Sequence, residues 1–123
     1  MVTMMAKYRV KDGKMEAVKK IVNDVFVKNA KDGLEISGVL YYYWSTAGTQ
    51  ADAYVCAQEA YDSAASLKKH LQQGGAVKEG RDKFQKLVNL ESCVISGPQE
   101  ELDKLKDEAA EYNAITRIIF AHI

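Results

Sequence analysis

The sequence predicts an α+β fold: a ferredoxin-like, split βαβ antiparallel sheet with helices on one face, followed by a C-terminal helix and strand. Two observations support this prediction. Segments with period-two alternation and segments with helical periodicity follow one another in the order strand, helix, two strands, helix, strand. In addition, one strand is apolar on both faces, so both sides of the sheet need to be covered. The chain of 123 residues is long enough for one domain with one core.

The first two elements have clear boundaries. Residues 3–10 alternate between apolar and polar side chains, and Asp12 and Gly13 then provide a turn. From 14 to 31 the apolar residues recur at spacings of three and four, which is typical of an amphipathic helix. This helix is expected to end at Asp32 and Gly33 and is long enough to cross a whole sheet.

The remaining elements of the split βαβ unit follow in order. We expect strands over residues 35–45, 53–59 and 90–96, and helical segments over 62–72 and 76–88. The close spacing of the second and third strands predicts a hairpin. The two glycines at 74 and 75 separate the two helical segments.

Residues 98–123 extend beyond this unit, which occupies residues 1–97. Pro98 and the acidic residues after it suit a helix start, and an apolar stripe runs through Leu102, Leu105 and Tyr112. A final strand is predicted over 114–122. We expect this extension to belong to the same domain and to lie at a dimer interface, with its strand added to the edge of the partner subunit's sheet.

The stretch VLYYYWS in the second strand argues for a dimer. Side chains alternate along a strand, so Tyr42 and Trp44 point to one face while Tyr41 and Tyr43 point to the other. Large aromatic surfaces left in water on the second face would be adhesive. The simplest cover is a second copy of the chain, so a homodimer is predicted. The alternative is a half-exposed face whose tyrosine hydroxyl groups reach water.

Composition argues against several classes of partner. Seventeen basic side chains balance seventeen acidic ones and form no stripe, so no nucleic-acid partner is expected. There is no apolar run of membrane-spanning length and no signal peptide pattern, which predicts a cytoplasmic protein without a membrane partner. The sequence has two histidines far apart and no HxH, HExxH, CxxC, GxGxxG or P-loop pattern, so neither a metal nor a nucleotide cofactor is expected.

The stretch EAYDSAASLKKHL resembles a motif of the antibiotic biosynthesis monooxygenase family of dimeric α+β barrels. The matching positions are Glu59 at the end of the third strand, Tyr61, Leu67 and His70. The upstream stretch KDGLEISGVLYYY is similar to the family's turn and second strand. The resemblance covers about residues 3–97.

The resemblance implies a homodimer whose two sheets form a barrel, with a pocket between helices and sheet in each subunit. Family members include cofactor-independent oxygenases of quinols or aromatic polyketides, and haem-degrading oxygenases. The haem-degrading members pair their histidine with an asparagine on the first strand and a tryptophan at the end of the third. This chain has Met4, Ala6 and Tyr8 on the apolar face of the first strand and Gln58-Glu59 at the end of the third, which argues against haem.

The candidate catalytic residues are His70 and Glu59. A neutral imidazole could take a proton from a phenolic substrate, and Glu59 could orient His70 or a substrate hydroxyl. The structural alternatives are a capping or surface histidine and a solvated charge at a helix start. The candidate substrate-binding residues form an aromatic wall for a flat ligand, although core packing is an alternative for each; they are Tyr42, Trp44, Tyr54 and Tyr61.

The predicted function is therefore a cofactor-independent monooxygenase acting on a small aromatic, quinol or polyketide-like molecule. The alternative is a non-catalytic small-molecule-binding or stress-related homodimer, in which core side chains fill the pocket. A cavity beside His70 would distinguish the two.

Overall fold

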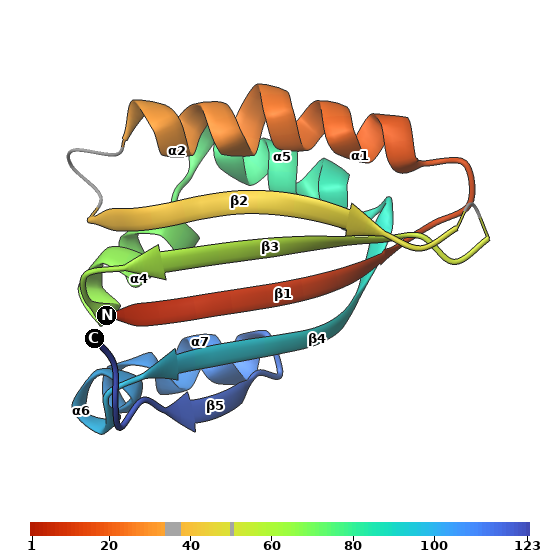
Figure 1. Cartoon of the computed structure of the whole chain (residues 1–123). Coiled ribbons are helices and arrows are strands. Elements are labelled where there is room, and N and C mark those ends of the chain that lie inside the picture. Colours follow the sequence, from red (N-terminus) through yellow and green to blue (C-terminus); the bar gives the residue numbers. More distant parts are fainter. Residues whose placement is uncertain (34–37, 50) are drawn as a thin grey trace.

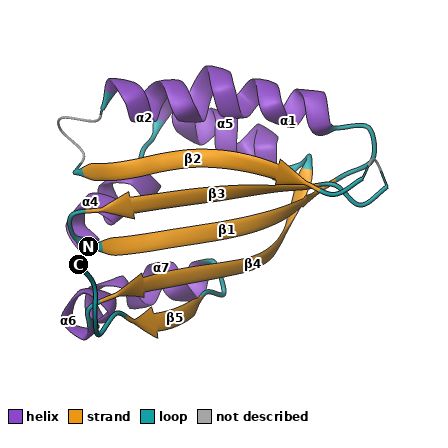
Figure 2. Ribbon diagram, viewed as in Figure 1, coloured by secondary structure: helices purple, strands orange, loops and turns teal. Residues whose placement is uncertain are grey.

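A five-stranded sheet with all its helices packed on one face forms the structure, which is a computed structural model describing residues 1–33, 38–49 and 51–123 (Figure 1). The strand order is β2-β3-β1-β4-β5, and the sheet is open within one chain. In Figure 2 the strands form a front layer, with α4, α5 and α7 behind it and α1 and α2 along the β2 edge. The predicted α+β, ferredoxin-like class is confirmed.

The four strands of the split βαβ unit pair as the sequence predicts. They are β1 (Val2–Val10), β2 (Val39–Ala47), β3 (Tyr54–Tyr61) and β4 (Val88–Gly97). The central strand β1 is antiparallel to both β3 and β4, and β2 forms the expected hairpin with β3. The predicted start of the second strand, from residue 35, lies partly outside the described residues.

The first helix is continuous from Met15 to Asp32 but changes its winding in the middle. It consists of α1 (Met15–Ile21), a π-helical segment η1 (Val22–Val27) and α2 (Lys28–Asp32). Its extent matches the prediction, whereas the π-helical segment was not predicted. Phe26, which faces the sheet, lies in this segment. None of the helices in the described ranges is long and apolar enough to cross a membrane.

The second helical region consists of α4 (Ala64–Leu71) and α5 (Gly75–Gln85). The helix predicted over 76–88 ends earlier than expected, because Val88 pairs with Val10 and begins β4. The break between α4 and α5 lies at the two glycines, as predicted. Gly75 has a positive φ of 59°, a conformation that glycine adopts at little cost.

The C-terminal unit folds back onto its own sheet. It contains α6 (Gln99–Leu102), the 3₁₀ turn η2 (Asp103–Leu105), α7 (Lys106–Glu111) and the short strand β5 (Ile115–Ile118). Because β5 pairs in parallel with β4, the expectation that this strand joins a partner's sheet is wrong. The chain reverses its direction at the end of α7. There Asn113 has a φ of 49°, and Ala114 N–H donates to Ala109 C=O at 2.7 Å. This reversal directs the chain back along β4.

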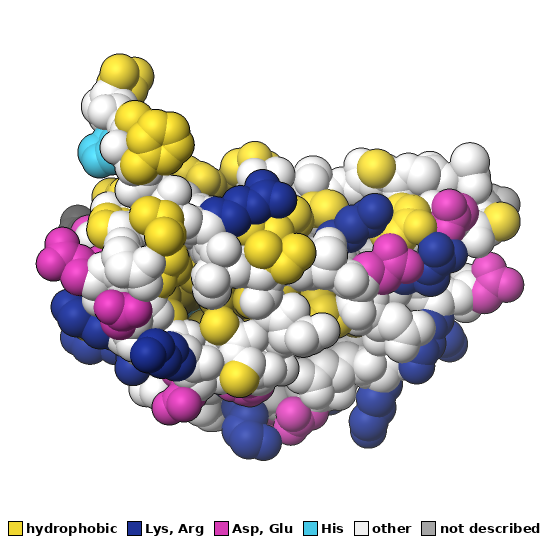
Figure 3. All heavy atoms as spheres, turned by 90° about the horizontal axis from the view of Figure 1, so that it is seen from below, with side chains coloured by type: hydrophobic (Ala, Val, Ile, Leu, Met, Phe, Trp, Pro, Cys, Tyr) yellow, Lys and Arg dark blue, Asp and Glu magenta, His cyan; other side chains and the backbone are white. Residues whose placement is uncertain are grey.

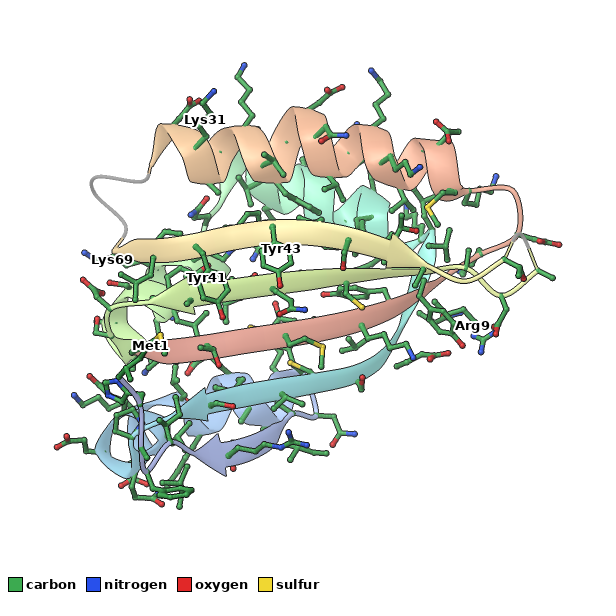
Figure 4. All side chains as sticks on the ribbon, in the orientation of Figure 1. Met1, Arg9, Lys31, Tyr41, Tyr43 and Lys69 are labelled. Carbon is green, nitrogen blue, oxygen red and sulfur yellow. The ribbon has the colours of Figure 1, made fainter. Side chains whose placement is uncertain are left out.

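The aromatic strand β2 places its side chains on both faces of the sheet. Tyr41 and Tyr43 point out of the face without helices (Figure 4), and Tyr42 and Trp44 lie on the helix side. Before this run, the register with β3 shifts by one residue between Val39 and Tyr41. As a result Val39 packs against the core and Leu40 is 55% exposed.

Two separate clusters of buried side chains fill the space between sheet and helices. The first lies around Tyr61, Leu67 and Ile95 and includes Leu102 and Leu105 of the C-terminal unit. The second packs the first helix and α5 against the opposite end of the sheet, with Val18, Phe26, Val55, Phe84 and Val88 among its members. The C-terminal unit is therefore part of the core.

We predict that Leu105→Ala lowers the free energy of unfolding by roughly 2 to 4 kcal/mol, because it leaves a hole beside a fully buried side chain. The neighbouring exposed Lys106→Ala should change it by less than about 0.5 kcal/mol. Urea denaturation at equal protein concentrations measures both. Equally small effects would contradict the packing of the C-terminal unit on the core.

Candidate functional site

A cavity of about 340 Å³ lies on the helix side of the sheet, lined by residues from both core clusters. The sequence opens this space by placing small residues in the middle strands. Ala6 of β1 and Ala57 of β3 are paired neighbours, and both line the cavity. Side chains from the first helix, α4, α5 and the end of the C-terminal helix complete the wall. The volume of the cavity falls within the range of small-molecule sites.

One wall of the cavity is aromatic. The Trp44 ring stacks on Tyr8 and Phe26, with ring centroids 6.0 and 5.9 Å apart, and meets Phe84 edge-on at 5.5 Å. Trp44 Nε1–H donates to the Tyr42 hydroxyl at 2.9 Å. The indole N–H is therefore satisfied within the protein, and the wall presents ring surfaces suited to a flat apolar ligand.

Glu59 and His70 form the polar part of the cavity wall. Glu59 Oε1 lies 3.9 Å from His70 Nε2 and accepts a hydrogen bond from the Tyr61 hydroxyl at 3.1 Å. Glu59 is only 6% exposed, and the His70 ring lies between those of Tyr42 and Tyr61, with centroids 5.4 and 5.5 Å away. The carboxyl group is thus buried with one fixed donor and one imidazole neighbour.

Local sequence fixes the helix that carries His70. Ser63 caps α4 by accepting a hydrogen bond from Ser66 N–H at 3.3 Å, and Leu67 is fully buried. His70 follows Leu67 by three residues and so lies on the same side of the helix. Gly38 has a φ of 67° and packs so tightly against Asp62 that a Cβ atom would clash, which ties the start of β2 to the start of α4.

Burial shifts the pKa values of both polar groups toward their uncharged forms. It raises the pKa of Glu59 to about 7, an effect that the Tyr61 hydrogen bond partly offsets. Burial lowers the pKa of His70 to about 4, and the nearby positive charge of Arg81 acts in the same direction. Burial also raises the pKa of the Tyr42 and Tyr61 hydroxyls. Near neutral pH the site therefore holds a neutral imidazole beside a carboxyl group that is easily protonated.

The structure brings most of the predicted site residues together. The cavity is lined by Glu59, His70, Tyr42 and Trp44. Tyr61 does not line it but contacts both Glu59 and His70. The cavity lies beside His70, where the predicted enzyme requires it.

Tyr54 is the exception, because it lies on the opposite face of the sheet. Its hydroxyl accepts a hydrogen bond from Arg9 Nη2 at 2.7 Å and donates to Asp52 Oδ1 at 3.1 Å, while Lys7 Nζ lies 4.1 Å from its ring centre. The expected aromatic wall therefore does not include Tyr54. Tyr54 precedes Glu59 by five residues on one regular strand, so the two side chains must point to opposite faces of the sheet.

Among the cavity residues that were not predicted as site residues are Tyr8, Arg81 and Tyr112. The alternation of the first strand puts Tyr8 on the inner face, which was a usable signal. Arg81 and Tyr112 reach the cavity only through the packing of α5 and the C-terminal unit. Within the described ranges, no group of three or more His, Cys, Asp and Glu side chains could hold a metal ion.

Comparison with known families identifies the relatives of this chain. The model of the antibiotic biosynthesis monooxygenase family matches residues 1–88. The chain belongs to the antibiotic biosynthesis monooxygenase family. Its residues after 88 lie outside the family match, and they include the whole C-terminal unit and all of β4 except Val88. No curated protein matches the chain significantly.

Several solved structures share the fold of this family member. MupZ from Pseudomonas fluorescens is 24% identical, with a TM-score of 0.82, and the match covers 99% of this chain and 92% of MupZ. An antibiotic biosynthesis monooxygenase is 14% identical with a TM-score of 0.59, covering 77% of this chain and 93% of that one. A dimeric ferredoxin-like protein from an uncultured marine organism is 15% identical with a TM-score of 0.59, covering 74% and 89%. The match to MupZ thus extends through the C-terminal unit.

The opposite pKa shifts of Glu59 and His70 predict opposite effects of pH on stability. The folded chain holds the Glu59 proton more tightly than the unfolded chain, so this contribution to stability is present below pH 4.5 and is lost as pH rises to about 7. His70 contributes stability above pH 6.5 that is lost as pH falls to about 4. The two trends oppose each other in the wild-type protein between these limits.

We therefore expect the stability of Glu59→Gln relative to wild type to increase by roughly 3 kcal/mol as pH rises from 4.5 to about 7, because only the wild type loses the contribution of Glu59. His70→Gln should show the opposite trend, losing stability relative to wild type as pH rises from about 4 to 6.5. Urea denaturation at a series of pH values measures these differences. Differences that stay constant with pH in both variants would contradict the buried, uncharged state of the site.

Proposed function

We propose that the protein is a cytoplasmic, cofactor-independent monooxygenase acting on a small aromatic, quinol or polyketide-like molecule. The observation that carries this proposal is the neutral imidazole of His70 beside the buried carboxyl group of Glu59, both at the wall of a cavity with an aromatic side. Family membership supports the general class. The ring surfaces suit a flat substrate, and the two polar groups suit proton transfer.

His70 is the proposed base. An imidazole that stays neutral near pH 7 can accept a proton from a phenolic hydroxyl or from an acidic carbon next to the ring. The resulting anion is electron-rich and can react directly with O₂. Trp44 and Phe84 would hold its rings, and Glu59 would position His70 or a substrate hydroxyl.

The electron balance restricts the substrate. One oxygen atom of O₂ enters the substrate and the other leaves as water, which requires four electrons. A substrate that is oxidised from a ring CH₂ group to a carbonyl supplies all of them and also provides the hydrogen atoms of the water. An anthrone contains such a CH₂ group, and a quinol supplies the same four electrons when it is oxidised to a quinone and one ring C–H becomes C–OH. Both are therefore appropriate test compounds.

A second candidate reaction transfers protons without oxidation, as in an isomerisation or a ring closure. The raised pKa of Glu59 favours it, because a carboxyl group protonated near neutral pH can donate a proton while His70 accepts one. The non-catalytic alternative assumed a pocket filled by core side chains. The open cavity beside His70 favours an enzyme over that form of the alternative.

We also propose a homodimer formed through the face of the sheet that carries no helix. Tyr41 and Tyr43 are 42% and 47% exposed on that face (Figure 4), and a structural neighbour is a dimeric ferredoxin-like protein. The end of the chain stands out from the body beyond the sheet (Figure 3), with Phe120 almost fully exposed. Contact of residues 119–123 with the second copy is part of this proposal.

The oxygenase proposal predicts O₂ uptake by the pure protein with anthrones or quinols, measured with an oxygen electrode. His70→Ala should reduce the rate by roughly a hundredfold or more, because the base is lost. Mass spectrometry with ¹⁸O₂ should find one labelled atom in the product.

Tyr54→Phe is the matched control, because Tyr54 lies on the opposite face and should leave the rate unchanged. No uptake across a broad panel of phenols by folded protein would rule out the oxygenase. A product of unchanged mass would instead support the proton-transfer reaction.

The dimer proposal predicts that Tyr43→Glu shifts the protein toward monomers in sedimentation equilibrium, because it places a charge in the buried interface. Lys31→Glu, on α2 along the β2 edge and pointing away from Tyr41 and Tyr43 (Figure 4), should leave the assembly unchanged. A monomeric wild-type protein, or an unaffected Tyr43→Glu dimer, would disprove this interface.

A further inference from the structure

Arg81 places a permanent positive charge at the cavity wall. It lies on α5, is half-buried and lines the same cavity as Glu59 and His70. Its Nη1 group donates to the backbone carbonyl of Leu71, the last residue of α4, and its Nη2 group donates to that of Gln73, just beyond the helix. These contacts hold the guanidinium group in place and leave its other N–H groups without a partner among the described residues.

No acidic side chain of the described residues lies within ion-pair distance of Arg81, because every ion pair among them involves another basic group. Two acidic residues line the cavity with it. Burial favours the uncharged form of Glu59, whereas Glu111 is exposed, so its charge is screened by water. Among the described residues the Arg81 charge therefore has no ion-pair partner, and the carboxyl groups that line the cavity offset it only in part.

The unused donors of this half-buried cation are available to an anionic ligand in the cavity. The planar guanidinium group matches a carboxylate in shape and can donate two parallel hydrogen bonds to it. The charge also acts on His70, so an anion bound at Arg81 would lie near the reacting groups. The aromatic wall of Tyr8, Trp44 and Phe84 lines the same cavity.

We propose that Arg81 binds a carboxylate on the substrate, so that the ligands of this cavity are aromatic acids. This inference rests on the proposed function for the identity of the reaction, but it concerns binding. Arg81 is then the residue that selects acids over their neutral analogues and orients the rings toward His70.

The test compares the binding of 6-hydroxy-2-naphthoic acid with that of its neutral amide at pH 7 without oxygen. Trp44 is the only tryptophan of the chain, and its ring lines the cavity, so its fluorescence can report occupancy. Isothermal titration calorimetry provides an independent measurement. We expect the acid to bind about tenfold or more tightly than the amide.

Arg81→Gln should remove this preference and leave amide binding unchanged, and Arg81→Lys should retain part of it. Arg9→Gln is the matched control, because Arg9 pairs with Asp52 and Glu91 on the opposite face of the sheet and should keep the full preference. Circular dichroism checks that each variant is folded. If Arg81→Gln does not fold, the wild-type comparison and Arg81→Lys decide.

Equal binding of acid and amide to the wild type would overturn the proposal. So would a preference that persists in folded Arg81→Gln, or no binding of either compound. An acid preference that depends on Arg81 without any O₂ uptake would contradict only the proposed reaction.

Discussion

The buried carboxyl group of Glu59 is the constraint around which the site is arranged. It lies on the inner face of a sheet that is otherwise apolar at this point, where an unpaired polar group would be costly. Tyr61, two residues further along the same face, donates to it, and α4 begins shortly afterwards and brings His70 to its other side. The end of α4 in turn accepts the hydrogen bonds of Arg81. Each contact positions the next group, so the site is built from one continuous stretch of strand and helix plus α5.

The cavity exists because the core is divided. Large side chains fill both ends of the inner face, whereas the paired residues Ala6 and Ala57 leave room in the middle. Trp44, Phe26 and Phe84 support one another through stacked and edge-on contacts, so the wall resists collapse into this space. An apolar space of this size in a small domain gives up packing contacts that would otherwise stabilise it. This loss is understandable if the space serves a ligand.

Much of this arrangement was readable from the sequence, and the failures have identifiable physical causes. Strict alternation placed Tyr41 to Trp44 on the correct faces, because a regular strand leaves no other choice. The shift at Leu40 was not readable, since a bulge depends on the register of the partner strand. Tyr54 was readable from its odd spacing to Glu59. Arg81 and Tyr112 were not, because their positions depend on how whole helices pack. The return of β5 to its own sheet depends on the left-handed conformation of Asn113. The presence of one asparagine in a sequence is not enough to predict that conformation.

The central position of β1 has a consequence for how the protein is made. This strand is synthesised before both of its neighbours, because β3 and β4 follow it in the chain. Its backbone and its apolar face must therefore stay unpaired at least until β3 has been translated, because no local hairpin can satisfy them. The sheet can close only when β4 has emerged, and β5 can add only after that. Until β4 is made, one edge of β1 has no partner, and that edge is open to non-native pairing and to chaperones that shield extended apolar segments.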